Sequence, residues 1–363
     1  MSGFRISNGP VFKVFEERCR ENIRRMAAKA ASQGVIFRPH FKTHASAVIG
    51  EWYRQEGVSR ITVSSVGMAE YFAAAGWNDI TIAFPFYAGI AERINALAEK
   101  IRLNIIVSTV GAAEQATGLL HYPINVFIET NTGYPRSGIK ADDYETIHQT
   151  YSWIKKNPNL AFMGFLSHFG HSYQAKGKKQ AEEIWHTGIA QLKKLKQQFP
   201  GSMISAGDTP CCSMVTDLSG ADEIRPGNFV FYDLMQVQIE SCKPENVAVA
   251  VYCPVVAIYP HEEKIVLHAG AVHLSKDSAE INGKKVYGQL GIVKEDGFPE
   301  YLDNCYIISL SQEHAVVHLP PKHMPLFREG MTVAVMPVHS CLNANAMGGG
   351  FVLPSMAAFV MMR

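Results

Sequence analysis

Short apolar runs alternate with amphipathic stretches through the first two thirds of the chain. Eight runs are predicted strands: residues 35–37, 61–63, 80–83, 104–107, 124–128, 161–166, 203–205 and 222–224. Helical stretches separate them, most clearly at 68–75, 90–100, 141–156 and 178–198. Strands that alternate with helices pair in parallel, and eight such units close into a (β/α)8 TIM-type barrel. A doubly wound sheet is the alternative, but no Gly-x-Gly-x-x-Gly turn follows any strand, which weakens a dinucleotide-binding domain.

The pattern changes from about residue 247. Short β-rich segments follow one another there, separated by Gly, Pro, Asn and Asp, at 247–258, 264–274, 285–293, 305–319 and 332–338. No convincing helix interrupts them, so an antiparallel β domain is predicted. We therefore expect two domains, a barrel over residues 1–244 and a C-terminal β domain over residues 245–363.

Composition narrows the class of protein. Of 363 residues, 47% are hydrophobic and 18% charged, which is typical of a soluble globular protein with a large core. Lys and Arg number 34 against 33 Asp and Glu, so no nucleic-acid or anionic-membrane partner is expected. Seven scattered cysteines, with neither a membrane-spanning run nor a signal-peptide pattern, favour a cytoplasmic protein.

A lysine follows the first predicted strand, in the segment Arg38-Pro-His-Phe-Lys-Thr-His44. Barrels keep their chemistry at the C-terminal ends of their strands, which is where Lys42 would lie. His40 and His44 flank it and Arg38 is close, and cationic neighbours lower the pKa of a lysine enough for Schiff-base chemistry. The alternative is a solvated loop residue, which a lysine without further supporting residues usually is.

Small and polar residues follow the later strands too. They include Arg136 after the fifth strand, His168 after the sixth, Gly207 and Thr209 after the seventh, and Gly227 and Asn228 after the eighth. Small residues and a hydroxyl after strands seven and eight are typical of a barrel that binds a phosphate with backbone N–H groups. A strand-one lysine together with a phosphate site indicates pyridoxal phosphate.

The same motifs resemble the fold-type III pyridoxal-phosphate enzymes, the alanine-racemase-like barrels, and within them the D-serine dehydratase / D-threonine aldolase family. The matching segments are 38–44, 129–138, 169–171, 207–210, 223–228, 311–314 and 337–341, in the family's order. The resemblance implies these cofactor contacts: Lys42 as the covalent anchor and base, Arg136 at the phenolic oxygen, His168 at the ring, and Gly207, Thr209, Gly227 and Asn228 at the phosphate.

His339 and Cys341 form a candidate metal pair in the second domain. On a strand, residues two apart point to the same face, so an imidazole and a thiolate can reach one ion. This donor set suits zinc and leaves positions open for water or substrate. A core cysteine beside a hydrogen-bonded histidine is the alternative. The resemblance favours zinc, because D-serine dehydratases of this type are similar at this pair and use zinc.

The predicted reaction is a pyridoxal-phosphate- and zinc-dependent β-elimination of a D-3-hydroxy amino acid, which would turn D-serine into pyruvate and ammonia. Retro-aldol cleavage, as in D-threonine aldolases, is the main alternative; racemisation and a non-catalytic carrier are weaker ones, since neither needs the metal. Two departures from the family pattern, His168 in place of Tyr and His268 in place of Asp, leave the substrate open. The resemblance also implies a head-to-tail homodimer with composite active sites.

Overall fold

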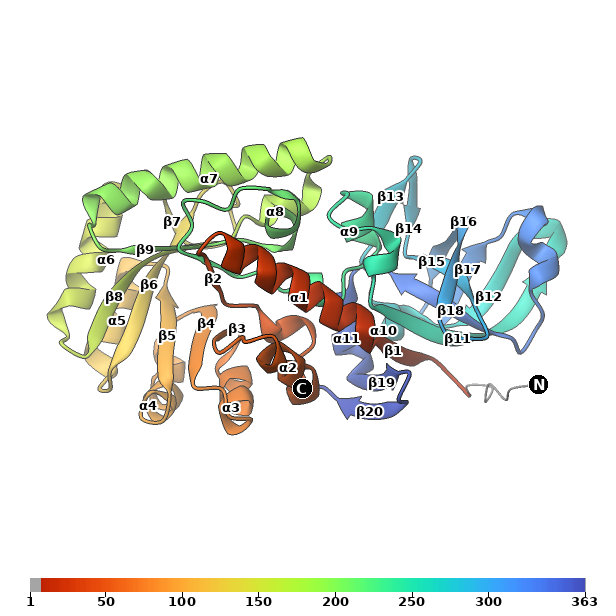
Figure 1. The fold of residues 1–363 in the computed structure, drawn as a ribbon, viewed down its shortest axis with the longest axis horizontal. Coiled ribbons are helices and arrows are strands. Elements are labelled where there is room, and N and C mark those ends of the chain that lie inside the picture. Colours follow the sequence, from red (N-terminus) through yellow and green to blue (C-terminus); the bar gives the residue numbers. More distant parts are fainter. Residues whose placement is uncertain (1–7, 363) are drawn as a thin grey trace. The chain divides into compact units, whose positions relative to one another are not determined.

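The computed structural model describes residues 8–362 of the chain (Figure 1). The chain divides into two compact units. The barrel unit comprises Ile23–Phe229 and Ile239–Ser241. The β unit comprises the N-terminal segment through Asn22, Val230–Gln238 and Cys242–Arg363.

Eight parallel strands form the sheet of the barrel unit, in the order β2-β10-β9-β8-β6-β5-β4-β3. They are β2 (Ile36–Phe37), β3 (Ile61–Val63), β4 (Asp79–Pro85), β5 (Arg102–Val107), β6 (Ile124–Asn131), β8 (Leu160–Ser167), β9 (Met203–Ala206) and β10 (Glu223–Ile224). The first and last strands of this order are joined by a parallel bridge between His40 and Thr62, whose amide donates to Pro39 O at 2.9 Å. The predicted TIM-type barrel is confirmed.

Helices cover the outside of this sheet (Figure 1). They are α2 (Ala47–Gln55), α3 (Val66–Ala74), α4 (Ala91–Ala98), α5 (Val110–Leu119), α6 (Tyr144–Lys156), α7 (Lys178–Gln198) and α8 (Thr209–Met214), while α1 (Glu16–Ser32) runs from the β unit into the barrel unit. Ser65, Thr109 and Asp143 accept a backbone N–H at the starts of α3, α5 and α6, as good N-caps do. No helix in the described chain is long and apolar enough to cross a membrane.

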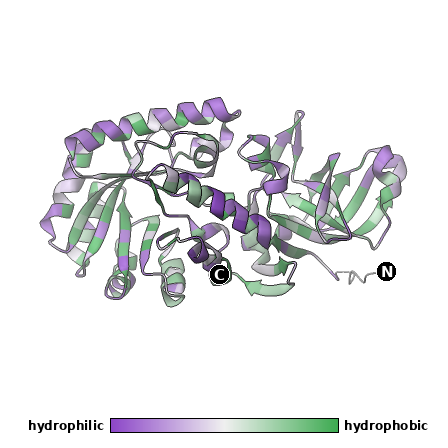
Figure 2. Cartoon of the chain, in the orientation of Figure 1, coloured by the Kyte–Doolittle hydropathy of each residue, from purple (hydrophilic) through white to green (hydrophobic). Residues whose placement is uncertain are grey.

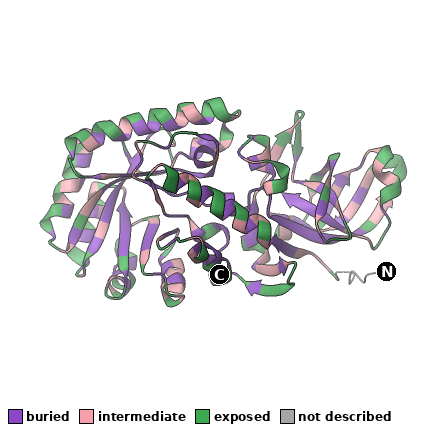
Figure 3. Cartoon of the chain, viewed as in Figure 1, coloured by how far each residue is buried: buried purple, intermediate pink, exposed green. Residues whose placement is uncertain are grey.

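The barrel core follows from the amphipathic pattern of its helices. In α7, the buried residues recur every three or four positions, as Ala181, Trp185, Ile189, Leu192 and Leu195. That spacing puts them on one helical face, while the opposite face stays polar. Figures 2 and 3 show the hydrophilic, exposed residues of α7 alternating with hydrophobic, buried ones around the helix.

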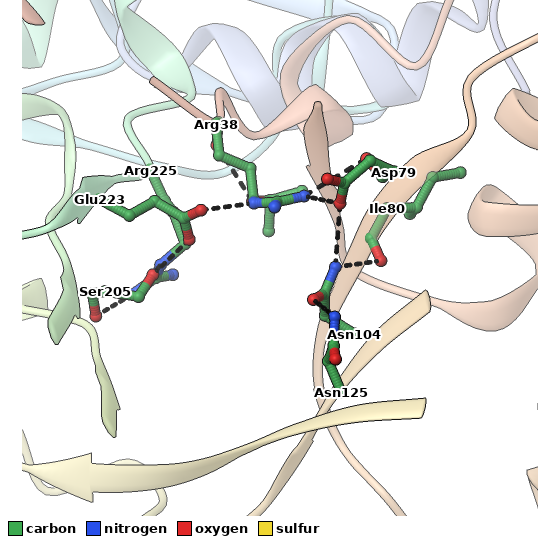
Figure 4. A network of polar contacts seen from close by, with 9 residues as sticks. Arg38, Asp79, Ile80, Asn104, Asn125, Ser205, Glu223 and Arg225 are labelled. Atoms are coloured by element: carbon green, nitrogen blue, oxygen red, sulfur yellow. Dashed lines mark hydrogen bonds and ion pairs between the residues drawn. The ribbon is translucent and has the colours of Figure 1, made fainter. Parts of the chain in front are cut away.

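A buried polar network crosses the interior of the barrel (Figure 4). Arg38, whose side chain is only 6% exposed, donates to Glu223 and to Asp79, each at 2.6 Å. Asp79 also accepts from Asn104 at 3.1 Å, and Glu223 accepts from Ser205 at 2.7 Å. The network therefore ties the first strand to strands on both sides of it.

Replacing Arg38 by alanine should lower the free energy of unfolding by about 3–5 kcal/mol, because two carboxylates with little solvent access would lose their cation. Urea denaturation followed by circular dichroism measures this. Arg93→Ala is the matched control, because it removes an exposed partner of Glu70 and should change stability little. Equal unfolding midpoints for the Arg38 variant and the wild type would contradict a stabilising role for the network.

The β unit contains a closed antiparallel barrel. Its six strands, β12-β17-β16-β15-β18-β11, close because β11 also pairs with β12. They are β11 (Val249–Tyr259), β12 (Lys264–His268), β15 (Gly288–Val293), β16 (Pro299–Leu310), β17 (His314–His318) and β18 (Thr332–Pro337). Strands β1 (Val11–Phe15), β19 (Gly349–Leu353) and β20 (Ala357–Val360) extend this sheet beyond β11, and β13 (Ala279–Ile281) forms a separate hairpin with β14 (Lys284–Val286). The expected antiparallel β domain is present.

The structure differs from the sequence expectation at both ends of the β unit. The N-terminal segment, expected in the barrel domain, groups with the β unit because β1 pairs antiparallel with β11, with Val14 opposite Val249. Two short helices also interrupt the β-rich segments where none was expected, α10 (Ala271–Leu274) and α11 (Ser340–Met347), and α9 (Leu234–Gln238) precedes them. Gly348 ends α11 at φ 68°, a left-handed conformation that glycine adopts without strain.

Candidate active site

Lys42 lies just beyond the C-terminal end of the first barrel strand, as the sequence predicts. It is the middle residue of a 3-10 turn, Phe41–Thr43, in which its two neighbours are buried and its own side chain is exposed. The backbone N–H of Lys42 donates to His40 Nδ1 at 3.4 Å. Two buried neighbours therefore anchor the turn that presents the amine.

Cationic side chains from several strand ends gather around His40 and His168. Burial, followed by the charges of Arg136, Lys42 and Arg225, lowers the pKa of His168 to about 3. The pKa of His40 is also well below its usual value, because of burial and the same three cations. The structure thus brings together residues that follow the first, fifth, sixth and eighth predicted strands. Such a concentration of positive charge suits the oxygens of a phosphate or phenolate group.

The loops after β9 and β10 pack closely together around Thr209, and this segment is called the cradle below. Thr209 Oγ1 accepts hydrogen bonds from the backbone N–H groups of Gly227 and Phe229, at 3.3 and 3.2 Å. Gly207 has φ 115°, which side-chain-bearing residues rarely adopt, and a Cβ on Gly227 would lie 3.0 Å from a main-chain oxygen. Asn228 is buried beside them. The backbone segments therefore pack so closely here that a residue larger than glycine would not fit at position 207 or 227 without a shift of its neighbours.

His168 is joined to this cradle. Its Nδ1 lies 3.3 Å from the backbone oxygen of Gly207, which can only accept, so Nδ1 carries the proton. Since the pKa of His168 is about 3, its imidazole is neutral near pH 7. The Tyr134 ring meets the His168 ring edge to face at 5.8 Å. Tyr134 is therefore a neighbour of His168 to which sequence reasoning gave no role, although it lies within the recognised segment 129–138.

The side chain of Arg136 is half exposed, and its neighbours come from strand β6 and from the loop that follows it. Its guanidinium lies 3.8 Å from Glu129 Oε1 and 5.8 Å from the centre of the Tyr134 ring. Ser137 donates to the same Glu129 oxygen at 2.8 Å. The loop after β6 therefore keeps the guanidinium near the strand end while leaving it accessible to a ligand.

Arg225 is the second site residue to which sequence reasoning gave no role. Its Nε donates to Ser205 Oγ at 2.8 Å and its terminal nitrogen to Ser167 O at 2.7 Å, and its side chain is buried. Burial lowers its pKa to about 10, although the nearby Glu223 carboxylate opposes this shift. Arg225 thus stays charged at neutral pH. Its position after the eighth strand was the available signal.

His339 and Cys341 lie in the β unit, and the strand geometry expected for them is wrong. Strand β18 ends at Pro337, His339 is the extended N-cap of α11 (φ −131°, ψ 103°), and Cys341 is the second residue of that helix. The two side chains nevertheless come within hydrogen-bonding reach of each other. They approach because the backbone changes from extended at His339 to helical at Cys341, and not because alternate residues of a strand share a face.

The surroundings of this pair favour a positive charge. His339 Nδ1 lies 2.6 Å from Asp277 Oδ2. Burial opposes ionisation of His339, but the hydrogen bonds with Asp277 and Cys341, and the charge of Asp233, raise its pKa to about 11. A metal ion could take the place of that proton. Within residues 8–362, no group of three or more histidine, cysteine or acidic side chains is arranged to hold a metal, so this pair would leave coordination positions open.

His44, two residues beyond Lys42, should make stability depend on pH. It is fully buried, packs against Phe41 with ring centres 4.5 Å apart, and burial lowers its pKa from 6.5 to about 3. The unfolded chain binds a proton that the folded state excludes, so stability present above pH 6.5 is lost as the pH falls toward 3. Between pH 7 and pH 5, the melting temperature of wild type should fall more than that of His44→Leu. His261→Leu, on an exposed turn, should keep the wild-type slope; an unchanged slope in the His44 variant would contradict this account.

Comparisons with known proteins show the family of this chain. The family model for the alanine racemase N-terminal domain matches residues 16–234, and that for a putative serine dehydratase domain matches residues 248–353. The chain belongs to the D-serine dehydratase branch of the fold-type III pyridoxal-phosphate enzymes. The enzymes of this branch are lyases. A D-serine dehydratase of Dictyostelium discoideum is 30% identical to this chain, in an alignment that covers 93% of this chain and 91% of the Dictyostelium enzyme. A D-threo-3-hydroxyaspartate dehydratase of Delftia sp. strain HT23 is 27% identical, over 92% and 90%.

Solved structures share the fold of this dehydratase-family chain. The Delftia enzyme superposes with a TM-score of 0.88 at 24% identity, covering 99% of this chain and 98% of that one. A D-threonine aldolase from Filomicrobium marinum superposes with a TM-score of 0.80 at 18% identity, covering 97% and 96%. These matches confirm the fold class of both units.

Proposed function

We propose that this protein is a pyridoxal-phosphate- and zinc-dependent lyase that removes water from a D-3-hydroxy amino acid such as D-serine. The observation that carries the proposal is the convergence of Lys42, Arg136 and Arg225 around His168, beside the glycine-rich cradle. The cations match the negative oxygens of the cofactor, and the lysine supplies the amine that the cofactor's aldehyde requires. Two dehydratases among the similar proteins favour elimination over other reactions of this cofactor.

Each residue would have a distinct task. The cofactor contacts would be Lys42 Nζ at the aldehyde carbon, Arg136 at the phenolic oxygen, His168 at the ring, and Gly207, Thr209, Gly227 and Asn228 at the phosphate. Bound there, pyridoxal phosphate supplies an electron sink for negative charge at the substrate Cα. Lys42 Nζ accepts the proton from Cα. The neutral imidazole of His168 would lie against the ring without adding positive charge.

His339 and Cys341 would hold zinc, a borderline-soft ion that suits a nitrogen and a thiolate. Two solved variants of a D-threo-3-hydroxyaspartate dehydratase support this. One replaces a histidine by alanine and the other a cysteine two positions further along, and the cysteine variant is described as being in the metal-free form. Zinc supplies Lewis acidity that helps the β-hydroxyl group to leave. Loss of water, followed by hydrolysis of the enamine, converts D-serine into pyruvate and ammonia.

Product analysis tests the reaction type. Purified protein should convert D-serine and D-threo-3-hydroxyaspartate into a 2-oxo acid and equimolar ammonia, and L-serine should give neither. Glycine and an aldehyde from D-threonine, without 2-oxo acid from any substrate, would instead establish a retro-aldol lyase. Appearance of the L-enantiomer alone would establish a racemase. If the protein binds the cofactor but forms no product from any D-amino acid, it would be a non-catalytic carrier of pyridoxal phosphate.

We also propose a homodimer in which the metal pair of one chain serves the cofactor of the other, as the resemblance to fold-type III dimers implies. Mixing inactive Lys42→Ala chains with inactive His339→Ala chains should then restore about a quarter of wild-type activity, because half of the random dimers carry one intact site of two. Size-exclusion chromatography with two different tags confirms that heterodimers form. Heterodimers without recovered activity would show that each chain builds its own site.

A further inference from the structure

A carboxylate far along the chain holds the ring of His339. Asp277 and His339 are 62 positions apart, and Asp277 Oδ2 lies 2.6 Å from His339 Nδ1. Both side chains are partly exposed, at 32% and 28%. At this distance of 2.6 Å the imidazole nitrogen donates and the carboxylate oxygen accepts, because a carboxylate has no proton to give. Nδ1 therefore carries a proton, and Nε2 is the nitrogen left for a ligand.

A second carboxylate fixes the backbone next to this ring. Asp233, which is 1% exposed, accepts from the backbone N–H and the hydroxyl of Ser340, at 2.9 and 3.2 Å. Its other oxygen accepts from the backbone N–H of Gln236 at 3.0 Å. The residue between His339 and Cys341 is thus held without any contribution from Asp277. Asp277 instead contacts the imidazole ring of His339 directly.

The segment that carries Asp277 is also braced against α11. The Asn343 side-chain amide donates to the backbone oxygen of His273, in α10, at 2.6 Å. Three residues after α10, the backbone N–H of Asp277 donates to Ser275 Oγ at 3.2 Å. These bonds join α10 to α11 and restrain the short segment between α10 and Asp277.

We infer that Asp277 is a positioning residue that orients His339 for metal binding at the His339–Cys341 pair, an inference that rests on the proposed function. A carboxylate that accepts from one ring nitrogen selects the tautomer, fixes the plane of the ring and makes the other nitrogen a stronger donor. Loss of such a partner typically weakens metal affinity by about 10–100-fold. Asp277 would act through His339 and touch neither the metal nor the substrate.

Zinc affinity of the metal-free, cofactor-loaded protein tests this inference, by competition with a chromophoric chelator. Asp277→Ala should raise the zinc dissociation constant about 10–100-fold. Asp277→Asn should show a smaller increase, because its amide oxygen can still accept from Nδ1 but carries no charge. Asp303→Ala, which removes an exposed carboxylate of the same unit, should bind zinc like the wild type.

Two further measurements separate the possible failures. The melting temperature of the metal-free protein should fall only slightly in Asp277→Ala, because both side chains of the pair are partly exposed. A large fall that accounts for the loss of affinity would make the role structural and overturn the inference. Wild-type zinc affinity in Asp277→Ala, together with weak binding in His339→Ala, would also overturn it while leaving the metal pair in place. Wild-type affinity in both His339→Ala and Cys341→Ala would show instead that the proposed metal site is wrong.

Discussion

Lys42→Ala protein should lose at least about 1,000-fold in turnover of a D-3-hydroxy amino acid. The expectation combines the loss of a general base, typically worth 10²–10⁴-fold, with the loss of the covalent anchor of the cofactor. The substitution should not unfold the protein, because the Lys42 side chain is exposed and its buried neighbours keep the turn in place. Steady-state assays of 2-oxo acid formation measure the effect.

Spectroscopy identifies the lysine independently of turnover. Wild-type protein should show the visible absorption of a pyridoxal-phosphate Schiff base, and borohydride reduction followed by peptide mapping should place the label on Lys42. Lys100→Ala, a change at an exposed lysine in the turn after α4, should keep both the absorption and the activity. Labelling of another lysine in the wild type would refute the assignment of the cofactor anchor.

Cys341→Ala should lose zinc and about 10²–10³-fold in turnover, and keep the visible absorption of the cofactor. The size follows from a Lewis-acid contribution of several kcal/mol, at 1.36 kcal/mol for each tenfold. Absorption should persist because the proposed cofactor residues all lie in the barrel unit, whereas Cys341 lies in the β unit. Elemental analysis for zinc, together with the assay, measures both effects.

Matched variants show whether the lower turnover of Cys341→Ala is caused by the loss of the metal. Cys242→Ala, at a half-buried cysteine outside the proposed site, should retain zinc and activity. Cys341→Asp should shift the preferred ion toward manganese, because a carboxylate is a harder ligand than a thiolate. Full turnover of the wild type after exhaustive chelation would rule out a catalytic role for the metal.

The barrel was predictable because its signals are local. Apolar runs that are buried on both faces identify parallel strands, and amphipathic spacing identifies the helices between them. Helix α7, for example, spans Lys178–Gln198, the same residues as the predicted segment 178–198. Strand β1 was missed because its partner, β11, lies far along the chain, and a short apolar run does not show which sheet it joins.

The metal pair shows a different limit. Residue types and spacing singled out His339 and Cys341, but the backbone between them turns from extended to helical, so the strand geometry was wrong. Short helices such as α10 and α11 leave too few turns for their periodicity to stand out against β-rich surroundings. Asp277 left no local signal, since only the packing of α10 against α11 brings it to His339.

The sequence by itself determined which residues stand at the strand ends, because strand order and strand ends follow from local hydrophobic patterns. Lys42, Thr209 and Gly227 were placed in this way. Only the tertiary structure decided that Arg136 and Arg225 act on His168, and that Asp277 binds His339. The physical reason is that charge and hydrogen bonding depend on distances across the fold, which spacing along the chain does not specify.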